Sequence, residues 1–197
     1  MADMFAAAPP EPLSALREWL AAAGAGGVRE PGALALATAG RDGRSESRIV
    51  QTLAIDADGL VFTTHTSSVK GRHIAETGWA SGVLYWREAG RQVTLAGPVT
   101  RLPDADSDAL WAARPAGTHP MTVASYQSEP LLDEEALRAE ALRLDRSGEP
   151  LPRPERFCGY RLSPSTVEFW QAGPDRLHRR LRFDRSGEAW TSRRLQP

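Results

Sequence analysis

The stretch EFWQAGPDRLHRRLRFDR, residues 168–185, places a dense set of cations beside a strand-like segment. Read as a strand, residues 176–183 alternate between two faces, and one face carries Leu177, Arg179, Leu181 and Phe183. The opposite face then carries only basic side chains, which are Arg176, His178, Arg180 and Arg182. Same-face neighbours on a strand lie about 7 Å apart, so these cations repel one another unless they are solvated or neutralised. The pattern indicates either a bound anion or an exposed edge strand that is kept basic against aggregation.

Further strand-like segments surround this stretch. They are residues 33–39, 47–55, 60–65, 79–86, 91–102, 157–162, 166–171 and 189–195, and the stretch itself supplies 176–184. Turn signals such as Asp42-Gly43 and Ser186-Gly187 separate consecutive segments, which favours antiparallel pairing. The segment WASGVLYW, residues 79–86, is apolar on both faces and is expected to be a central buried strand. Pro98 suggests a bulge or an edge in the segment that follows.

Helix signals lie before and between these strands. A helix is expected after Pro12, a short one over residues 67–77, a capped one over 104–115 and an amphipathic one over 133–145, whereas 118–128 is ambiguous. The combination predicts an α+β fold, a mostly antiparallel barrel with peripheral helices. Residues 1–12 are expected to form a flexible leader, and residues 13–197 a single domain.

The composition excludes several classes of protein. The chain has 197 residues and a net charge of −1, so bulk electrostatics does not favour nucleic-acid binding. One cysteine, Cys158, allows neither an intramolecular disulfide nor a cysteine-based zinc site, and the four histidines are too scattered to predict a metal site. No stretch is long and apolar enough to span a membrane, and a cytoplasmic location is expected. No phosphate-loop or dinucleotide-binding glycine motif occurs.

Groups suited to an anion or a flat ring recur near strand ends. Ser67, Ser68 and Lys70, the only lysine, stand where a helix follows a strand, and free backbone N–H groups there favour a phosphate. Arg48, Gln92, Gln127 and Ser128 add polar groups, and Trp170 could cover a ring. A planar phosphorylated cofactor such as flavin mononucleotide (FMN) would use all of these. Taken singly, each has an ordinary reading as a surface cation, a helix end or a core tryptophan.

Several motifs carry a family resemblance when they are read in order. SRIVQTL (47–53), LVFTTHTSSVK (60–70), ARPAGTHPM (113–121), YQSE (126–129) and the stretch 168–185 resemble the pyridoxamine 5′-phosphate oxidase-like flavoproteins, over a region from about residue 30 to the end. Within that family, WASGVLYWRE and PLPRPE look most like the FMN-dependent oxidases of phenazine biosynthesis. The resemblance implies a split β-barrel homodimer with FMN in the cleft between subunits.

The resemblance also implies the residues that hold the cofactor, some of them from the partner chain. These are Arg48, Ile49, Val50, Gln51, Thr63, Thr64, Ser68, Lys70, Gln92, Gln127, Ser128, Trp170 and Arg180. Arg48 and Lys70 would hold the phosphate. Val69 stands where the family normally has an arginine, so one phosphate contact is lost or replaced.

Substrate positions separate the branches of the family. The vitamin B6 oxidases hold the substrate phosphate with a lysine, a tyrosine, an arginine and a serine, and the matching residues here are Leu53, Leu110, Arg114 and Thr118. Each lost charge-assisted hydrogen bond weakens binding by about 1.5–3 kcal/mol, and leucines suit a larger, flatter substrate. Arg176 and His178 remain and could hold a carboxylate, while Arg182 is explained equally well by solvent or an acidic neighbour.

The resemblance thus implies an FMN-dependent oxidase of a reduced phenazine-carboxylic acid, at the dihydro, tetrahydro or hexahydro level. Hydride would pass to the flavin N5, and O2 would reoxidise the flavin to give H2O2. No catalytic acid or base is assigned, and neither nucleic acid nor membrane is expected as a partner. The alternatives are a pyridoxamine 5′-phosphate oxidase and a flavin-binding split-barrel protein without turnover.

Overall fold

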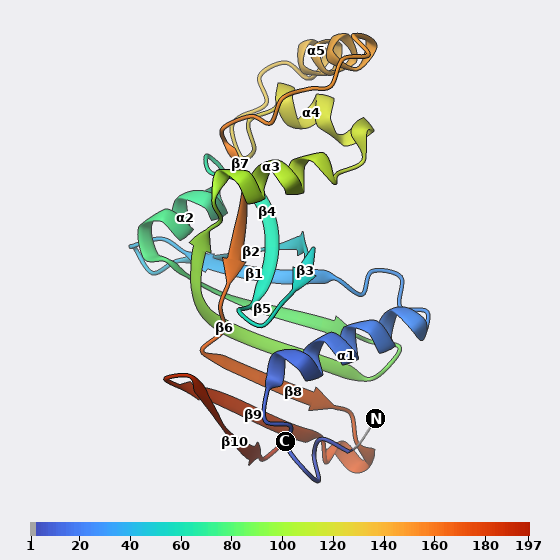
Figure 1. Cartoon of the computed structure of the whole chain (residues 1–197), viewed down its shortest axis with the longest axis vertical. Helices are drawn as coiled ribbons and strands as arrows, with labels where there is room; N and C mark the ends of the chain where they lie inside the picture. The colour runs from blue at the N-terminus through green and yellow to red at the C-terminus, as the bar shows by residue number, and fades with distance from the viewer. Residues whose placement is uncertain (1–2) are drawn as a thin grey trace.

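The computed structural model describes residues 3–197. The helices are α1 (Pro12–Ala25), α2 (Val69–Thr77), α3 (Asp104–Ala112), α4 (His119–Ala124) and α5 (Glu134–Arg146). The strands are β1 (Ala33–Ala39), β2 (Ser45–Gln51), β3 (Ala54–Ile55), β4 (Leu60–His65), β5 (Trp79–Trp86), β6 (Arg91–Arg101), β7 (Phe157–Leu162), β8 (Thr166–Gln171), β9 (Arg179–Ser186) and β10 (Ala189–Leu195). Figure 1 shows α3, α4 and α5 gathered at the end of the molecule opposite β9 and β10.

The strands form a curled antiparallel sheet in which β6 is the pivot. The long path runs β10-β9-β8-β6-β5-β1-β2, and β7, β4 and β3 continue from β6. Residues 91–96 of β6 pair with β8, whereas residues 99–101 pair with β7. The change of partner falls at Gly97-Pro98, where a Cβ on Gly97 would overlap the Ser163 carbonyl oxygen. The predicted α+β, mostly antiparallel split barrel is confirmed, and Pro98 lies at its bend.

Helix α1 covers one face of the long sheet (Figure 1). Its apolar stripe, which includes Leu13, Leu16 and Trp19, is almost fully buried. The Trp19 ring lies 5.1 Å from the Phe169 ring and 6.4 Å from the Trp86 ring, both edge-on. The core therefore lies between α1 and the side chains that alternate inward from the sheet.

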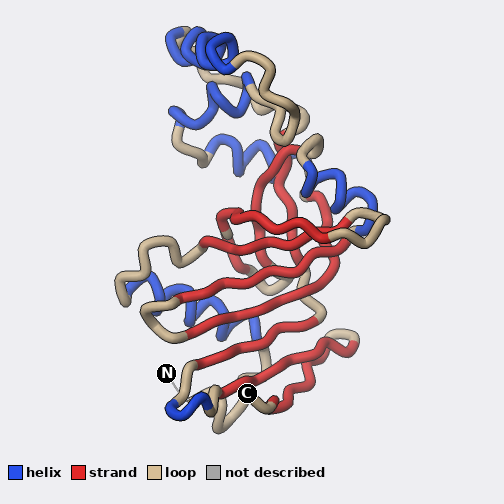
Figure 2. The backbone as a smooth tube through the Cα atoms, turned by 180° about the vertical axis from the view of Figure 1, so that it is seen from behind, coloured by secondary structure: helices blue, strands red, loops and turns tan. Residues whose placement is uncertain are grey.

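The opposite face of the sheet is open (Figure 2). The predicted burial of both faces of residues 79–86 is wrong, because Trp79 is 48% exposed and Tyr85 is 57% exposed while Ala80, Leu84 and Trp86 are buried. The segment is central, between β1 and β6, but only one of its faces is covered within the chain. An apolar sequence on such a face is typical of a surface that contacts another molecule.

The basic stretch does not form a strand from residue 176. Residues Pro174–Arg176 form a 3₁₀ turn, Asp175 and Arg176 have φ of 53° and 61°, and β9 begins at Arg179. Left-handed backbone breaks the strand period, so the four predicted cations do not share one face. The predicted strand over 176–184 is therefore wrong for its first three residues. Helix α3 also differs from prediction, because Pro103 provides no side-chain cap.

The segment expected to be a leader packs on the sheet. Met4 and Phe5 are buried, and the Arg179 guanidinium lies 2.5 Å from an Asp3 carboxylate oxygen. Arg194 donates a hydrogen bond to the Phe5 carbonyl oxygen at 2.9 Å. These contacts join the start of the chain to β9 and β10, and the flexibility of the segment stays a prediction.

Candidate functional site

A cavity of about 380 Å³ opens between β2, β4, the start of α2 and the segments around residues 115 and 127. Its lining residues are Ile49, Val50, Gln51, Leu53, Thr63, Thr64, Lys70, Arg114, Pro115, Thr118, Gln127 and Phe157. Most were predicted for the cofactor, and Arg114 and Thr118 for the substrate. Leu53 lines the cavity, whereas Leu110 does not and packs over Gly159.

The start of α2 shapes one end of this cavity. Ser68 is fully buried, and its hydroxyl accepts a hydrogen bond from the Gly71 backbone N–H at 3.2 Å. A Cβ on Gly71 would overlap the carbonyl oxygens of His65 and Thr66, so only glycine lets the helix begin this close to β4. This start places Lys70 in the first turn, beside the end of β4.

A chain of polar contacts crosses the same end of the cavity. The Lys70 ammonium donates to the Thr64 hydroxyl at 3.2 Å, and that hydroxyl donates to the Gln127 Oε1 at 3.1 Å. The Ser128 hydroxyl accepts a hydrogen bond from the Val69 backbone N–H at 3.3 Å. Gln127 thus contacts β4, and Ser128 contacts the start of α2, within their own chain.

The cations of this site are poorly compensated. Burial lowers the pKa of Lys70, and the nearby positive Arg48 lowers it further. Arg48 donates to the Thr38 hydroxyl at 2.7 Å and lies 3.7 Å from Glu46. The ion pairs found within residues 3–197 include neither Lys70 nor Arg114. Half-buried cations without a carboxylate partner fit an anionic ligand such as a phosphate.

His65 lies behind the cavity and was not singled out from the sequence. Its side chain is 1% exposed, and neither ring nitrogen has a hydrogen-bond partner in the described part of the chain, residues 3–197. Burial, together with the positive Arg156, Lys70 and Arg114, lowers the pKa of His65 to about 4. The imidazole is therefore neutral at pH 7 and adds no further charge to the site.

The remaining predicted residues form a second group on the open face of the sheet. Gln92, Trp170 and Arg180 lie side by side on β6, β8 and β9, because Gln92 pairs with Trp170 and Trp170 with Arg180. The His178 ring lies 4.7 Å from the Trp170 ring, and Arg176 is exposed in the preceding turn. None of these side chains lines the 380 Å³ cavity.

Acidic neighbours neutralise part of the positive charge of the basic stretch 176–182. Arg180 lies 2.7 Å from Glu168, and Arg182 lies 3.0 Å from Asp184. Two of the four cations are thus neutralised by carboxylates of their own sheet. Arg176 has no carboxylate within ion-pair distance among residues 3–197, and the His178 Nδ1 accepts the Gly173 N–H at 3.3 Å.

The two groups are far apart in one chain. Strands β1 and β5 lie between β2 and β6, and β8 and β9 lie beyond β6. At about 4.8 Å per strand, Gln92 lies about 14 Å from Gln51 along the sheet and Arg180 about 24 Å from it. Measured along the sheet of one chain, the second group therefore lies three to five strands from the cavity.

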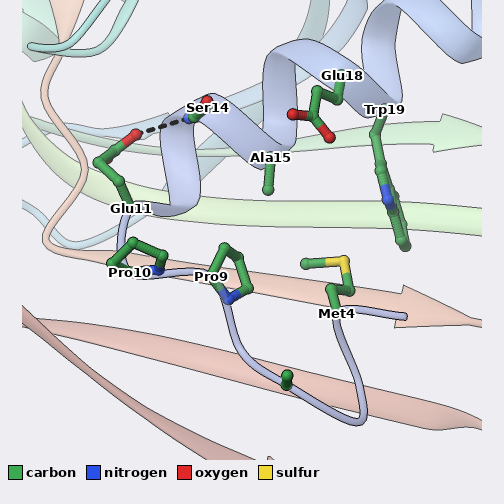
Figure 3. Close-up of a pocket in the computed structure, with 9 residues that line it drawn as sticks. Met4, Pro9, Pro10, Glu11, Ser14, Ala15, Glu18 and Trp19 are labelled. Atoms are coloured by element: carbon green, nitrogen blue, oxygen red, sulfur yellow. Dashed lines mark hydrogen bonds between the residues drawn. The ribbon is translucent and has the colours of Figure 1, made fainter. Parts of the chain in front are cut away.

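A larger cavity of about 620 Å³ lies between the N-terminal segment and α1 (Figure 3). Its apolar walls come from Met4, Pro9, Pro10 and Trp19. The Glu11 carboxylate caps α1 by accepting hydrogen bonds from the backbone N–H groups of Leu13 and Ser14. It contains none of the predicted site residues. We therefore place the candidate site in the smaller cavity, which holds the uncompensated cations.

Two protein-family models match this chain. A model described as pyridoxamine 5′-phosphate oxidase matches residues 20–146. The chain belongs to the pyridoxamine 5′-phosphate oxidase family. A second model, described as the pyridoxine 5′-phosphate oxidase C-terminal dimerisation region, matches residues 157–197, where β7 to β10 lie. The resemblance seen in the sequence is confirmed.

Relatives within the family carry two different names. Dihydrophenazinedicarboxylate synthase of Burkholderia lata is 52% identical over 96% of this chain and 89% of its own length, and that of Pseudomonas chlororaphis is 50% identical over 96% and 85%. A pyridoxine/pyridoxamine 5′-phosphate oxidase of a Cyanothece strain is 38% identical over 95% and 89%. The higher identity to the first two agrees with the branch that the motifs indicated.

Solved structures share the fold. The crystal structure of PhzG from Burkholderia lata 383 in complex with tetrahydrophenazine-1-carboxylic acid matches with a TM-score of 0.98 at 50% identity, over 100% of this chain and 98% of that one. A pyridoxamine 5′-phosphate oxidase-related, FMN-binding protein of Nostoc punctiforme matches with a TM-score of 0.79 at 20% identity, over 96% and 100%. The second likeness shows the fold alone.

No helix within residues 3–197 combines the length and the apolar character needed to cross a membrane. The same residues contain no group of three or more His, Cys, Asp or Glu side chains placed to hold a metal ion.

Proposed function

We propose that this chain is an FMN-dependent oxidase that oxidises a reduced phenazine-carboxylic acid. The observation that carries the proposal is the cavity whose half-buried Lys70 and Arg114 have no carboxylate partner among residues 3–197. Support also comes from the names of the two relatives at 52% and 50% identity and from the tetrahydrophenazine-1-carboxylic acid in the PhzG complex. We also propose that residues 13–197 act as one domain, since β6 joins the strands before and after the helices.

Lys70 and Arg48 would hold the FMN phosphate, with the hydroxyls of Thr64 and Ser68 beside them. The fit rests on charge, because an anion would offset the burial, and the repulsion from Arg48, that together lower the pKa of Lys70. When bound, FMN would supply the redox chemistry, which is the two-electron oxidation of the substrate with O2 as the final acceptor and H2O2 as product. Ile49, Val50 and Gln51 would line the ring.

A second copy of the chain would complete the site. Gln92, Trp170 and Arg180 lie three to five strands from the cavity along the sheet of one chain. We propose that the partner's copies of these residues, and of His178, approach the cavity instead. The open sheet face, on which Tyr85 is 57% exposed, supports this contact, as does the match of residues 157–197 to a dimerisation region.

The substrate would lie between the two groups. Leu53 and Phe157 give the cavity apolar walls for a flat ring, and Arg114 gives it a cation. Burial lowers the pKa of Arg114, which marks a charge held partly away from water and suited to a carboxylate. Arg176 and His178 of the partner would hold a second polar group.

The chain's own contribution would be orientation and charge. Aromatisation drives the oxidation of a reduced phenazine, so no strong base is required, and we assign no side chain as acid or base. His178 could relay a proton, but its contact with the Trp170 ring favours a binding role.

A comparison of two substrates tests the proposal. Oxygen uptake should be measured with a reduced phenazine-carboxylic acid and with pyridoxamine 5′-phosphate, each at several concentrations. We expect kcat/KM to favour the phenazine by at least about 100-fold, since two polar phosphate anchors of the B6 oxidases are leucines here. A preference for pyridoxamine 5′-phosphate would instead make the chain a B6 oxidase.

A further inference from the structure

Arg156 reaches from the segment before β7 to the end of α4. Its guanidinium and Nε donate hydrogen bonds to the carbonyl oxygens of Thr122, Val123 and Ser125. The guanidinium also lies over the Tyr126 ring, with its carbon 4.1 Å from the ring centroid. A cation bound to the last carbonyls of a helix satisfies groups that the helix itself leaves unpaired.

The backbone of the same residue holds a different segment. The Arg156 carbonyl oxygen accepts a hydrogen bond from the Thr66 backbone N–H at 2.7 Å. Thr66 belongs to the connection between β4 and α2, two residues before the cap Ser68. Arg156 therefore joins the two segments that meet at the end of the cavity where Lys70 lies, which is the end proposed to hold the FMN phosphate.

The segment that Arg156 holds carries Gln127 and Ser128. Gln127 accepts from Thr64, which accepts from Lys70, and Ser128 accepts from the Val69 N–H. Ser128 has φ of 73°, a conformation that a non-glycine residue adopts only when its surroundings impose it.

Apolar packing does not explain how this segment is held. Residues 126–136 are all exposed, so no side chain there is anchored in the core. The contacts of Arg156 come immediately before these residues, at 122–126. Arg156 does not itself line the cavity.

We infer that Arg156 is a positioning residue that sets Gln127 and Ser128 against Thr64 and the start of α2, and so shapes the phosphate end of the cofactor site. The inference rests on the proposed FMN function. It assigns Arg156 no contact with the cofactor. Its effect must therefore pass through Gln127 and Ser128.

Flavin affinity tests the inference on the full chain. The dissociation constants of FMN and of riboflavin, which lacks the phosphate, should be measured by fluorescence quenching for wild type, R156A and R156M. R156M keeps the aliphatic stem of the side chain and serves if R156A fails to fold. We expect both variants to bind FMN about tenfold or more weakly and riboflavin within about threefold of wild type. R143A is the matched control, because the ion pair that Arg143 forms within residues 3–197 is with Glu140 on exposed α5.

A double-mutant cycle separates positioning from a general loss of structure. In a Q127A/S128A background, R156M should weaken FMN binding by no more than about threefold, because the residues through which Arg156 acts are gone. Three results would each overturn the inference. The first is full additivity of R156M with Q127A/S128A. The second is an FMN affinity of R156M equal to that of R143A, and the third is an equal loss of FMN and riboflavin affinity in R156M.

Amide hydrogen exchange gives a readout that needs no flavin. We expect residues 122–129 of R156M to exchange faster than those of wild type and of R143A. If wild type binds neither flavin, the proposed function fails, while the exchange rates still decide whether Arg156 holds the segment. Unchanged exchange in R156M would overturn that part of the inference.

Discussion

Replacement of Lys70 by methionine tests the charge that the site depends on. The Lys70 ammonium has one hydrogen-bond acceptor, the Thr64 hydroxyl at 3.2 Å, and no carboxylate partner within residues 3–197. A charge-assisted bond from it to a phosphate contributes about 1.5–3 kcal/mol net. The substitution K70M should therefore raise the dissociation constant of FMN by about 10- to 150-fold.

In the flavin-free protein, the K70M substitution should not lower thermal stability. Burial and the nearby Arg48 both lower the pKa of Lys70, so the charged form is held at a cost in free energy. Removing the charge should leave the thermal unfolding midpoint of the flavin-free protein equal to that of wild type or higher. Thr64 keeps its bond to Gln127 in this variant.

Titration of FMN and riboflavin into K70M, K70R and wild type is the assay, with thermal unfolding of each flavin-free protein beside it. K70R retains the charge and should lose much less FMN affinity than K70M, and riboflavin affinity should stay within about threefold in all three. An FMN dissociation constant for K70M within about twofold of wild type would refute the reasoning. So would equal losses of both flavins together with a lowered unfolding midpoint.

Three further predictions follow from the site. Because the pKa of His65 is lowered to about 4, the unfolded state takes up a proton between pH 6.5 and 4 that the folded state does not, and the free energy of unfolding should fall by about 2–3 kcal/mol across that range. Urea unfolding at both ends of the range should show this loss in wild type and a smaller one in H65N; equal losses would contradict it. L53K should lower KM for pyridoxamine 5′-phosphate by about tenfold or more in steady-state assays, and L53M should not. Y85D should elute as a monomer at a concentration where wild type is dimeric and should lose FMN without a lower unfolding midpoint; a dimeric, flavin-loaded Y85D would contradict the proposed interface.

Local signals predicted most of the fold. The Asp42-Gly43 turn joins β1 to β2, with Gly43 at φ of 76°. Helix α5 forms where the amphipathic pattern indicated a helix, and Asp133 caps it. The alternation of residues 176–178 led to a wrong strand prediction, because the backbone at Asp175 and Arg176 has positive φ, which a sequence alternation does not reveal. The predicted burial of both faces of residues 79–86 was wrong for another reason. Composition does not distinguish a sheet face covered by the chain itself from a face left open.

The part of the candidate site formed by residues close together in the sequence could be predicted. Ser68 and Lys70 follow a strand and open a helix, and that order alone indicates an anion site. The division of the predicted residues into two distant groups depends on strand order, which local patterns do not carry. His65 and Arg156 were missed because their contacts lie with residues distant in sequence.

The most direct test of the central claim is the visible absorbance spectrum of the FMN-loaded protein under anaerobic conditions, before and after addition of a reduced phenazine-carboxylic acid. The account predicts that the flavin bands bleach on addition and return when air is admitted. Bands that persist after the addition would leave a flavin-binding protein without this oxidation. A protein that binds no FMN would contradict the account of the cavity itself.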